Sequence, residues 1–317
     1  MRYRPEDSTS SPRFCGIRTF MRLPAVRDLE NADFAIVGVP FDTGSSYRVG
    51  ARFAPEAIRS ASILLRPCDA ERGIDIFDHL SGIDYGDLPV VPGFIEDSFE
   101  RIQGALRPIV AAGVIPICLG GDHSVALPLL RAVAEKHGPL ALVHFDSHSD
   151  AWDQYYGHRY FHGTPMLRAH EENLIDPTKT IQIGMRGGVY EAKDRDFPKS
   201  LGFEVISTRE LVKSSPEEMV VRIKERVSTA KTYLSFDIDV LDPAFAPGTG
   251  TPEIGGPSTH QILEVLRGLT EIDFVAFDLV EVIPTFDAGQ ITSLAAAGII
   301  FEFLGLLAVR KMGDDKE

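Results

Sequence analysis

Short apolar runs recur along the chain and alternate with stretches in which apolar residues are spaced by three or four positions. The runs predict buried strands, and the spaced stretches predict helices that face a core. Expected strands cover residues 34–39, 83–86, 114–119, 140–146, 180–185, 203–206, 232–239 and 274–280. Expected helices cover 97–112, 124–136, 216–227 and 259–269, with one more beginning near Pro55 and another closing the chain. This alternation predicts an α/β fold whose parallel sheet is covered on both faces.

The 317 residues contain no repeat, low-complexity tract or linker, which indicates a single domain over 1–317. Residues 1–30 are expected to form a polar N-terminal arm with irregular structure. The apolar run from Ile291 to Val309 approaches membrane-spanning length. It contains Glu302 and several small residues and it ends an α/β pattern, so we interpret it as a core helix.

The chain is acidic, with 46 Asp and Glu against 32 Lys and Arg and a formal charge of −14. This charge argues against nucleic acid or an anionic membrane as a partner and leaves cationic small molecules compatible. Three cysteines without a C-x-x-C spacing indicate neither a disulfide scaffold nor a zinc ribbon. The first residues have no apolar signal segment, so a cytoplasmic setting is expected.

Polar residues with metal-binding chemistry follow the strand at 140–146. Asp146, His148 and Asp150 occupy every second position, and in an extended chain such residues point to one side. The carboxyl ends of strands are where open α/β sheets bind ligands. A polar exit from a strand is the alternative interpretation of this motif alone.

Three further strands end in residues of the same kind. His123 follows the strand at 114–119, Asp237 and Asp239 end the strand at 232–239, and Glu281 follows the strand at 274–280. In a parallel sheet all these ends lie on one edge. Four carboxylates, counting Asp146 and Asp150, cannot all stay ionised at close range without compensation. Two divalent cations would compensate them, whereas a D-x-D motif alone is equally typical of a calcium loop or a solvated turn.

Five motifs resemble the ureohydrolase family of arginases, agmatinases and guanidino-acid hydrolases. They are GGDHS (120–124), HFDSHSD (144–150), HGTP (162–165), SFDIDVLDPAFAPGTGTPEIGG (235–256) and EVIP (281–284). The chain looks closest to the agmatinase-like branch, which includes guanidinobutyrase and guanidinopropionase. The resemblance implies an arginase-like three-layer α/β/α sandwich with a mainly parallel sheet. It also implies assembly into a trimer or hexamer, homo- or hetero-oligomeric.

The resemblance also implies a binuclear metal site. One ion would be held by His123, Asp146, Asp150 and Asp237. The other would be held by Asp146, His148, Asp237 and Asp239. Manganese is the usual ion of the family, and some relatives use nickel.

The implied reaction is hydrolysis of a C–N bond in a guanidino compound, which releases urea and an amine. Two cations sharing a water lower its pKa and provide the nucleophile. Asp150 would orient this nucleophile and Glu281 would pair with the guanidinium. His162 matches the proton shuttle of the family, although a histidine in such a loop is otherwise unremarkable.

The aromatic loop at 151–161 departs from the family. Trp152 stands where relatives commonly have Asn, Tyr or a small polar residue, which makes arginine an unfavourable substrate. Tyr155 and Arg159 lie in the same loop and are candidate substrate contacts. Arg159 would favour a guanidino acid over agmatine, and Trp152 would favour a compact guanidine or an alkylated biguanide. Packing at a subunit interface is the alternative for the aromatics.

Three other functions compete with this interpretation. Agmatinase is the alternative within the family. A zinc amide deacetylase needs one metal with an Asp-His-Asp set, and the additional His123 and Asp239 argue against it. A non-catalytic subunit that depends on an active partner would have lost a ligand, and this chain has lost none.

Overall fold

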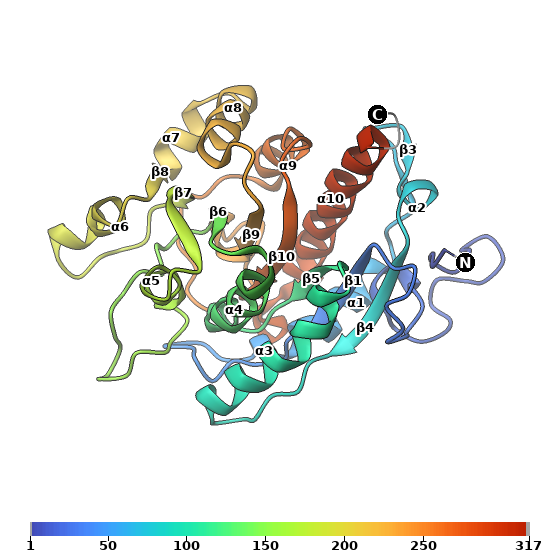
Figure 1. The fold of residues 1–317 in the computed structure, drawn as a ribbon, viewed down its shortest axis with the longest axis horizontal. Coiled ribbons are helices and arrows are strands. Elements are labelled where there is room, and N and C mark those ends of the chain that lie inside the picture. The colour runs from blue at the N-terminus through green and yellow to red at the C-terminus, as the bar shows by residue number, and fades with distance from the viewer. Residues whose placement is uncertain (1, 315–317) are drawn as a thin grey trace.

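The computed structural model describes residues 2–314 and contains an eight-stranded sheet (Figure 1). All neighbouring strands in this sheet are parallel. Their order across the sheet is β4 (Gly82–Asp87), β1 (Phe34–Gly38), β5 (Ile115–Leu119), β10 (Phe274–Val280), β9 (Thr232–Asp237), β6 (Leu140–Phe145), β7 (Ile175–Met185) and β8 (Glu204–Ser207). A separate antiparallel ribbon pairs β2 (Cys68–Asp69) with β3 (Ile74–Asp75).

Ten α-helices lie within the described residues. They are α1 (Ala54–Ser62), α2 (Ile76–His79), α3 (Ile95–Ala111), α4 (Ala126–His137), α5 (Pro165–Glu171), α6 (Phe197–Ser200), α7 (Thr208–Lys213), α8 (Pro216–Val227), α9 (Thr259–Arg267) and α10 (Ile291–Asp314). The predicted start of α8 is confirmed, because Ser215 and Glu218 form a capping box with proline at the first turn.

The sheet separates two hydrophobic clusters. Successive residues of β1 alternate between them, with Phe34 and Ile36 in one cluster and Ala35 and Val37 in the other. The first cluster includes apolar residues of α1, α8, α9 and α10, and the second those of α3, α4 and α5. Helices therefore cover both faces (Figure 1), which confirms the predicted three-layer α/β/α arrangement.

The main differences from the predicted elements are short helices and strand ends. Helices α5 and α7 are only 7 and 6 residues long, too short for a clear apolar period, and were not predicted. The strand predicted over 232–239 ends at Asp237. The Asp237 side chain accepts a hydrogen bond from the backbone N–H of Asp239, which begins a 3₁₀ turn at Ile238–Val240.

The N-terminal segment is irregular, as predicted, but part of it packs into the core. Phe20, Met21 and Leu23 are buried in the cluster that contains α1. The Phe20 N–H donates to Asp84 of β4, and the Met21 N–H donates to Ser62 at the end of α1. The segment therefore covers the β4 edge of the sheet rather than extending into solvent as an arm.

Helix α10 is apolar enough to cross a membrane by length and composition alone. Its apolar window has a mean hydropathy of 2.0, and 72% of that window is buried within the protein. Glu302 in this helix accepts hydrogen bonds from Arg72 Nη1 at 2.6 Å and Arg267 Nε at 3.1 Å. Burial together with this ion-pair network agrees with the predicted core helix.

Replacing Glu302 by Ala is expected to lower the free energy of unfolding by about 3 kcal/mol, near the lower end for a broken buried ion pair. The loss of stability is expected to be near the lower end of the range for buried ion pairs, because Arg72 keeps Asp69 as a partner. The control is Glu264→Ala, which removes a more exposed carboxylate from Arg267 and should cost under about 1 kcal/mol. Urea unfolding measures both, and equal losses would contradict the structural role given to Glu302.

Candidate metal centre and active site

The predicted site residues come from four strands that are neighbours in the sheet. In the order β5, β10, β9 and β6, the carboxyl ends of these strands lead to His123, Glu281, Asp237 and Asp146. The parallel arrangement thus brings together residues that are up to 158 positions apart in sequence, such as His123 and Glu281. This is the crevice in which open α/β sheets bind ligands.

Two site residues adopt backbone conformations that residues other than glycine rarely adopt. Asp150 has φ 49° and Glu281 has φ 66°, both in the left-handed region. The expectation that Asp146, His148 and Asp150 converge through an extended chain is wrong, because β6 ends at Phe145. Asp150 instead turns back in the left-handed conformation and shares a partner with Asp146. Strain of this kind is typical of functional sites.

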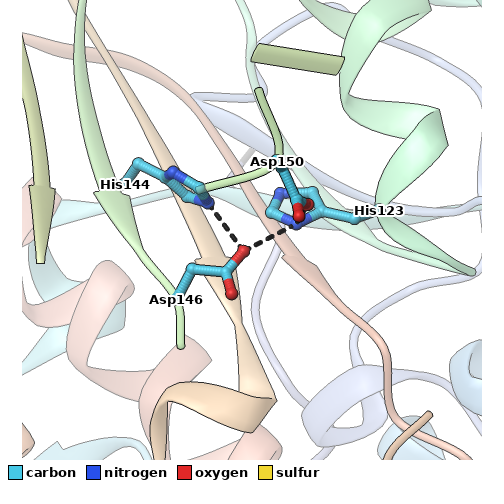
Figure 2. A group of neighbouring side chains, drawn as sticks. All are labelled: His123, His144, Asp146 and Asp150. Atoms are coloured by element: carbon cyan, nitrogen blue, oxygen red, sulfur yellow. Dashed lines mark hydrogen bonds and ion pairs between the residues drawn. The ribbon is translucent and has the colours of Figure 1, made fainter. Parts of the chain in front are cut away.

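Three carboxylates converge on one ring nitrogen. His123 Nδ1 lies 2.8 Å from Asp150 Oδ2, 3.1 Å from Asp146 Oδ2 and 3.3 Å from Asp237 Oδ2. All four side chains are buried. Figure 2 shows the Asp150 carboxylate against the His123 ring, with Asp146 between His123 and His144. The structure therefore places together all four residues predicted for the first ion.

The other nitrogen of His123 shows how this cluster is oriented. Its Nε2 lies 2.8 Å from Ser235 Oγ, and that hydroxyl donates to Asp278 Oδ1 at 2.8 Å. The Ser235 oxygen therefore accepts the Nε2 proton, and in a neutral ring Nδ1 presents its lone pair to three carboxylates. Such an arrangement needs a cation between these atoms or a second proton on the ring. One nitrogen and three oxygens suit a divalent metal ion.

A second group of possible ligands lies next to the first. His148 Nδ1 is 3.0 Å from Asp239 Oδ2 and 3.6 Å from Asp146 Oδ1. The potential ligand atoms of Asp146, His148 and Asp239 all lie within 4.8 Å of one another. Asp146 belongs to both groups, with Oδ2 facing His123 and Oδ1 facing His148. This position suits a carboxylate that bridges two ions.

The carboxylates of this cluster do not share one electrostatic environment. Burial and the neighbouring carboxylates raise the pKa of Asp237 well above its usual value, and burial likewise raises the pKa of Asp239. Burial also opposes ionisation of Asp146, but the neighbouring histidines His123, His144 and His148 lower its pKa. Two divalent cations would remove the repulsion that keeps Asp237 and Asp239 from ionising freely. The donor set therefore fits the predicted ions.

Two residues behind Asp146 were not predicted to act in the site. His144 Nε2 lies 2.9 Å from Asp146 Oδ2 (Figure 2). The Gln182 amide lies 3.0 Å from His144 Nδ1. Since the amide N–H₂ can only donate, His144 presents its Nε2 proton to Asp146. His144 is thus better suited to orient Asp146 than to bind a metal. Its place two positions before Asp146 in β6 is the sequence signal that identifies it.

Glu281 connects the cluster to His162. Its Oε1 accepts from the backbone N–H of His123 at 2.8 Å and lies 3.0 Å from His162 Nδ1. Its Oε2 is buried and has no hydrogen-bond partner in the described part of the chain. Burial disfavours a charged His162, but the charge of Glu281 outweighs burial and raises the pKa of His162 to about 9. Metal ions bound nearby would lower this pKa again.

A cavity of about 160 Å³ opens onto His162 and part of the carboxylate cluster. Asp150, Asp237, His148 and His162 line one part of it, and Trp152 and Tyr155 line another. Tyr190 completes the aromatic wall, with its ring centre 5.2 Å from that of Trp152. Tyr190 was not predicted because its loop carries no motif.

Arg159 lies outside this cavity. Its side chain is 59% exposed and pairs with Glu171, and it is not among the residues that line the cavity. The structure therefore brings Trp152 and Tyr155 to the candidate site but does not bring Arg159 there.

Comparison with known proteins agrees with this geometry. The model of the arginase family matches residues 32–305. The chain belongs to the arginase family. It is 47% identical to a guanidinopropionase of Pseudomonas aeruginosa, across 96% of each chain. It is 42% identical to a guanidinobutyrase of the same organism, across 96% of this chain and 97% of that protein. The family predicted from the five motifs is thus confirmed.

Arginase-family structures share the fold described above. The proclavaminate amidino hydrolase of Streptomyces clavuligerus superposes with a TM-score of 0.91. It is 42% identical and covers 95% of this chain and 100% of its own. The arginase-like fold predicted from the motifs is confirmed.

Replacing Glu281 by Gln is expected to lower the pKa of His162 from about 9. The substitution removes the negative charge that stabilises the protonated His162 ring. Burial, which disfavours the protonated ring, remains. NMR titration of histidine-labelled, metal-free protein measures this pKa, with His162→Ala used to assign the signal. An unchanged pKa would show that Glu281 does not control the ring.

Proposed function

We propose that this protein hydrolyses a C–N bond of a guanidino compound and releases urea and an amine. The observation that carries the proposal is the unpaired Glu281 Oε2, buried beside the His123 cluster. A guanidinium group would satisfy this acceptor with a charge-assisted hydrogen bond. Its carbon would then be held close to the candidate metal ligands. The printed names of the arginase-family relatives support the same substrate class.

The proposed cofactors are two divalent ions. One would be held by His123, Asp146, Asp150 and Asp237, and the other by Asp146, His148, Asp237 and Asp239. We propose manganese, because carboxylate oxygens outnumber imidazole nitrogens in both sets, with nickel as the alternative. When bound, such ions supply a water acidic enough to act as a nucleophile near neutral pH.

The protein residues would then position and protonate the reactants. Asp150 lines the cavity and lies at the cluster, so it is placed to orient the nucleophile. Glu281 would hold the guanidinium, and its contact with His162 would keep that ring at the leaving nitrogen. His162 would transfer the proton that the leaving amine needs.

The aromatic wall is proposed to select a compact guanidine or a guanidino acid rather than arginine. Trp152, Tyr155 and Tyr190 restrict the cavity and offer π faces to a cationic group. Agmatine remains the alternative substrate, since the position of Arg159 gives no support for a carboxylate contact. Relatives named for guanidino acids favour the acid.

The protein is proposed to be catalytic by itself, because all six candidate ligands are present at the cluster. A cytoplasmic trimer or hexamer is proposed from the resemblance alone, and light scattering of the purified protein would determine the assembly. Activity that appears only after co-expression with a second chain would favour the partner-dependent alternative.

Urea release tests the proposed reaction directly. Purified protein is reconstituted with Mn²⁺ or Ni²⁺ and assayed with guanidine, guanidinoacetate, guanidinopropionate, guanidinobutyrate, agmatine, arginine and N-methylated biguanides. Release of urea from a guanidino acid or compact guanidine supports the proposal. Absence of urea with every compound and both ions would overturn it.

Replacing Asp237 by Ala is expected to abolish activity and to remove at least one ion per subunit, because Asp237 is proposed to contact both. Asp239→Ala should spare the ion at His123 and remove the other. Elemental analysis after dialysis counts the ions in wild type and both variants. Full occupancy in Asp237→Ala would contradict the bridging role.

Replacing Trp152 by Asn is expected to reduce kcat/KM for the preferred compact substrate and to raise it for longer guanidines. The loss of a cation–π contact corresponds to about 0.5–2 kcal/mol. Tyr156→Asn is the control, because Tyr156 is 79% exposed and does not line the cavity. An unchanged order of substrates in Trp152→Asn would identify the indole as a packing residue.

A further inference from the structure

Ser46 contacts the ring of His162 from the wall of the candidate active site. It lies on the loop after β1 and lines the same cavity as His162 and Asp150. Its hydroxyl oxygen is 2.6 Å from His162 Nε2, and its backbone N–H donates to the same nitrogen at 3.1 Å. No sequence motif pointed to this residue.

These contacts determine which nitrogen of His162 carries the proton. A backbone N–H can only donate, so in the neutral ring His162 Nε2 accepts and carries no proton of its own. The ring proton is then on Nδ1, where it is donated to Glu281 Oε1 at 3.0 Å. His162 is thus held with its basic nitrogen directed at the Ser46 hydroxyl.

The loop that carries Ser46 is fixed to the protein at several points. The Gly44 carbonyl accepts from the His162 N–H at 2.9 Å, and the Gly44 N–H donates to the buried Asp122 at 2.7 Å. The Gly50 N–H donates to Asp42 at 2.8 Å. These bonds couple the loop to His162, so the short contact with Ser46 belongs to an ordered network.

We propose that the Ser46 hydroxyl relays the proton between His162 and the leaving amine, an inference that rests on the proposed function. His162 first accepts at Nε2 the proton lost by the attacking water. As the C–N bond breaks and its electron pair stays on nitrogen, Ser46 Oγ gives its proton to that nitrogen. Ser46 Oγ takes the Nε2 proton of His162 in the same step. Ser46 is unchanged at the end, and one proton has moved from the imidazolium to the amine.

The backbone of Ser46 assists this transfer. When Nε2 is protonated, the Ser46 N–H faces another N–H instead of an acceptor, so that hydrogen bond is lost. The loss disfavours the imidazolium and promotes release of its proton. The hydroxyl, which both accepts and donates, is the part of Ser46 that can carry the proton onward.

The test compares Ser46 variants of the metal-reconstituted enzyme on its best substrate. Ser46→Ala is expected to reduce kcat by about 10²-fold, the lower end for lost acid–base help, with KM nearly unchanged. Ser46→Thr keeps the hydroxyl and should retain kcat within about 10-fold of wild type. Ser46→Val has the shape of the threonine variant but lacks the hydroxyl, so it should resemble Ser46→Ala. Ser45→Ala is the matched control, because its hydroxyl makes only a 3.5 Å contact with Asp122.

A double variant separates the relay from a general structural role. If Ser46 acts through His162, Ser46→Ala combined with His162→Ala should be no slower than His162→Ala alone. Nitrogen-15 NMR of the metal-free Ser46→Ala protein, recorded above the pKa of His162 so that the ring is neutral, should still show the proton on Nδ1, because the Ser46 N–H remains. Additive losses in the double variant, or wild-type kcat in Ser46→Ala or Ser46→Val, would overturn the relay. Since wild type must release urea for these comparisons, a wild type inactive on all compounds overturns the proposed function instead.

Discussion

The burial of carboxylates around His123 is the constraint on which the site depends. Asp146, Asp150 and Asp237 approach one imidazole nitrogen at 2.8–3.3 Å, away from water. Such a group is not stable as a set of free anions, because burial and mutual repulsion both oppose ionisation. Within the described residues, hydrogen bonds hold the cluster in one geometry: Ser235 accepts from His123, and His144 and Ser147 donate to Asp146 and Asp239. Burying these carboxylates therefore lowers the stability of the folded protein, and bound cations would offset this cost by balancing their negative charge.

The position of this cluster follows from the sheet. Strands β5, β10, β9 and β6 are buried on both faces, so neighbouring strand ends are held firmly at one edge. Each strand contributes one or more polar side chains within four residues of its last apolar residue. The two apolar layers hold the strands rigidly, and the loops at the edge of the sheet carry the candidate ligands and catalytic residues. Glu281 and His162 extend the cluster toward the cavity by direct hydrogen bonds rather than by flexible contacts.

Much of this arrangement could be predicted from sequence because it depends on local patterns. Apolar runs located the central strands, and polar residues at their ends located His123, Asp146, Asp237 and Glu281. The path of Asp150 could not be predicted, since its left-handed backbone is imposed by contacts made only in the folded chain. Ser46 and Tyr190 could not be predicted as site residues for a similar reason. Both lie on loops without a period, and only tertiary structure brings them to the cavity.

The order of the strands has a consequence for how the protein matures. Strand β10 is the last strand of the chain, yet it lies between β5 and β9 in the middle of the sheet. Until it emerges from the ribosome, β5 and β9 each have an unpaired edge, and Glu281 is missing from the cluster. Unpaired strand edges of this kind are templates for edge-to-edge aggregation. Insertion of β10 is therefore a late event of biosynthesis, and the carboxylate cluster around His123 acquires its complete surroundings only afterwards.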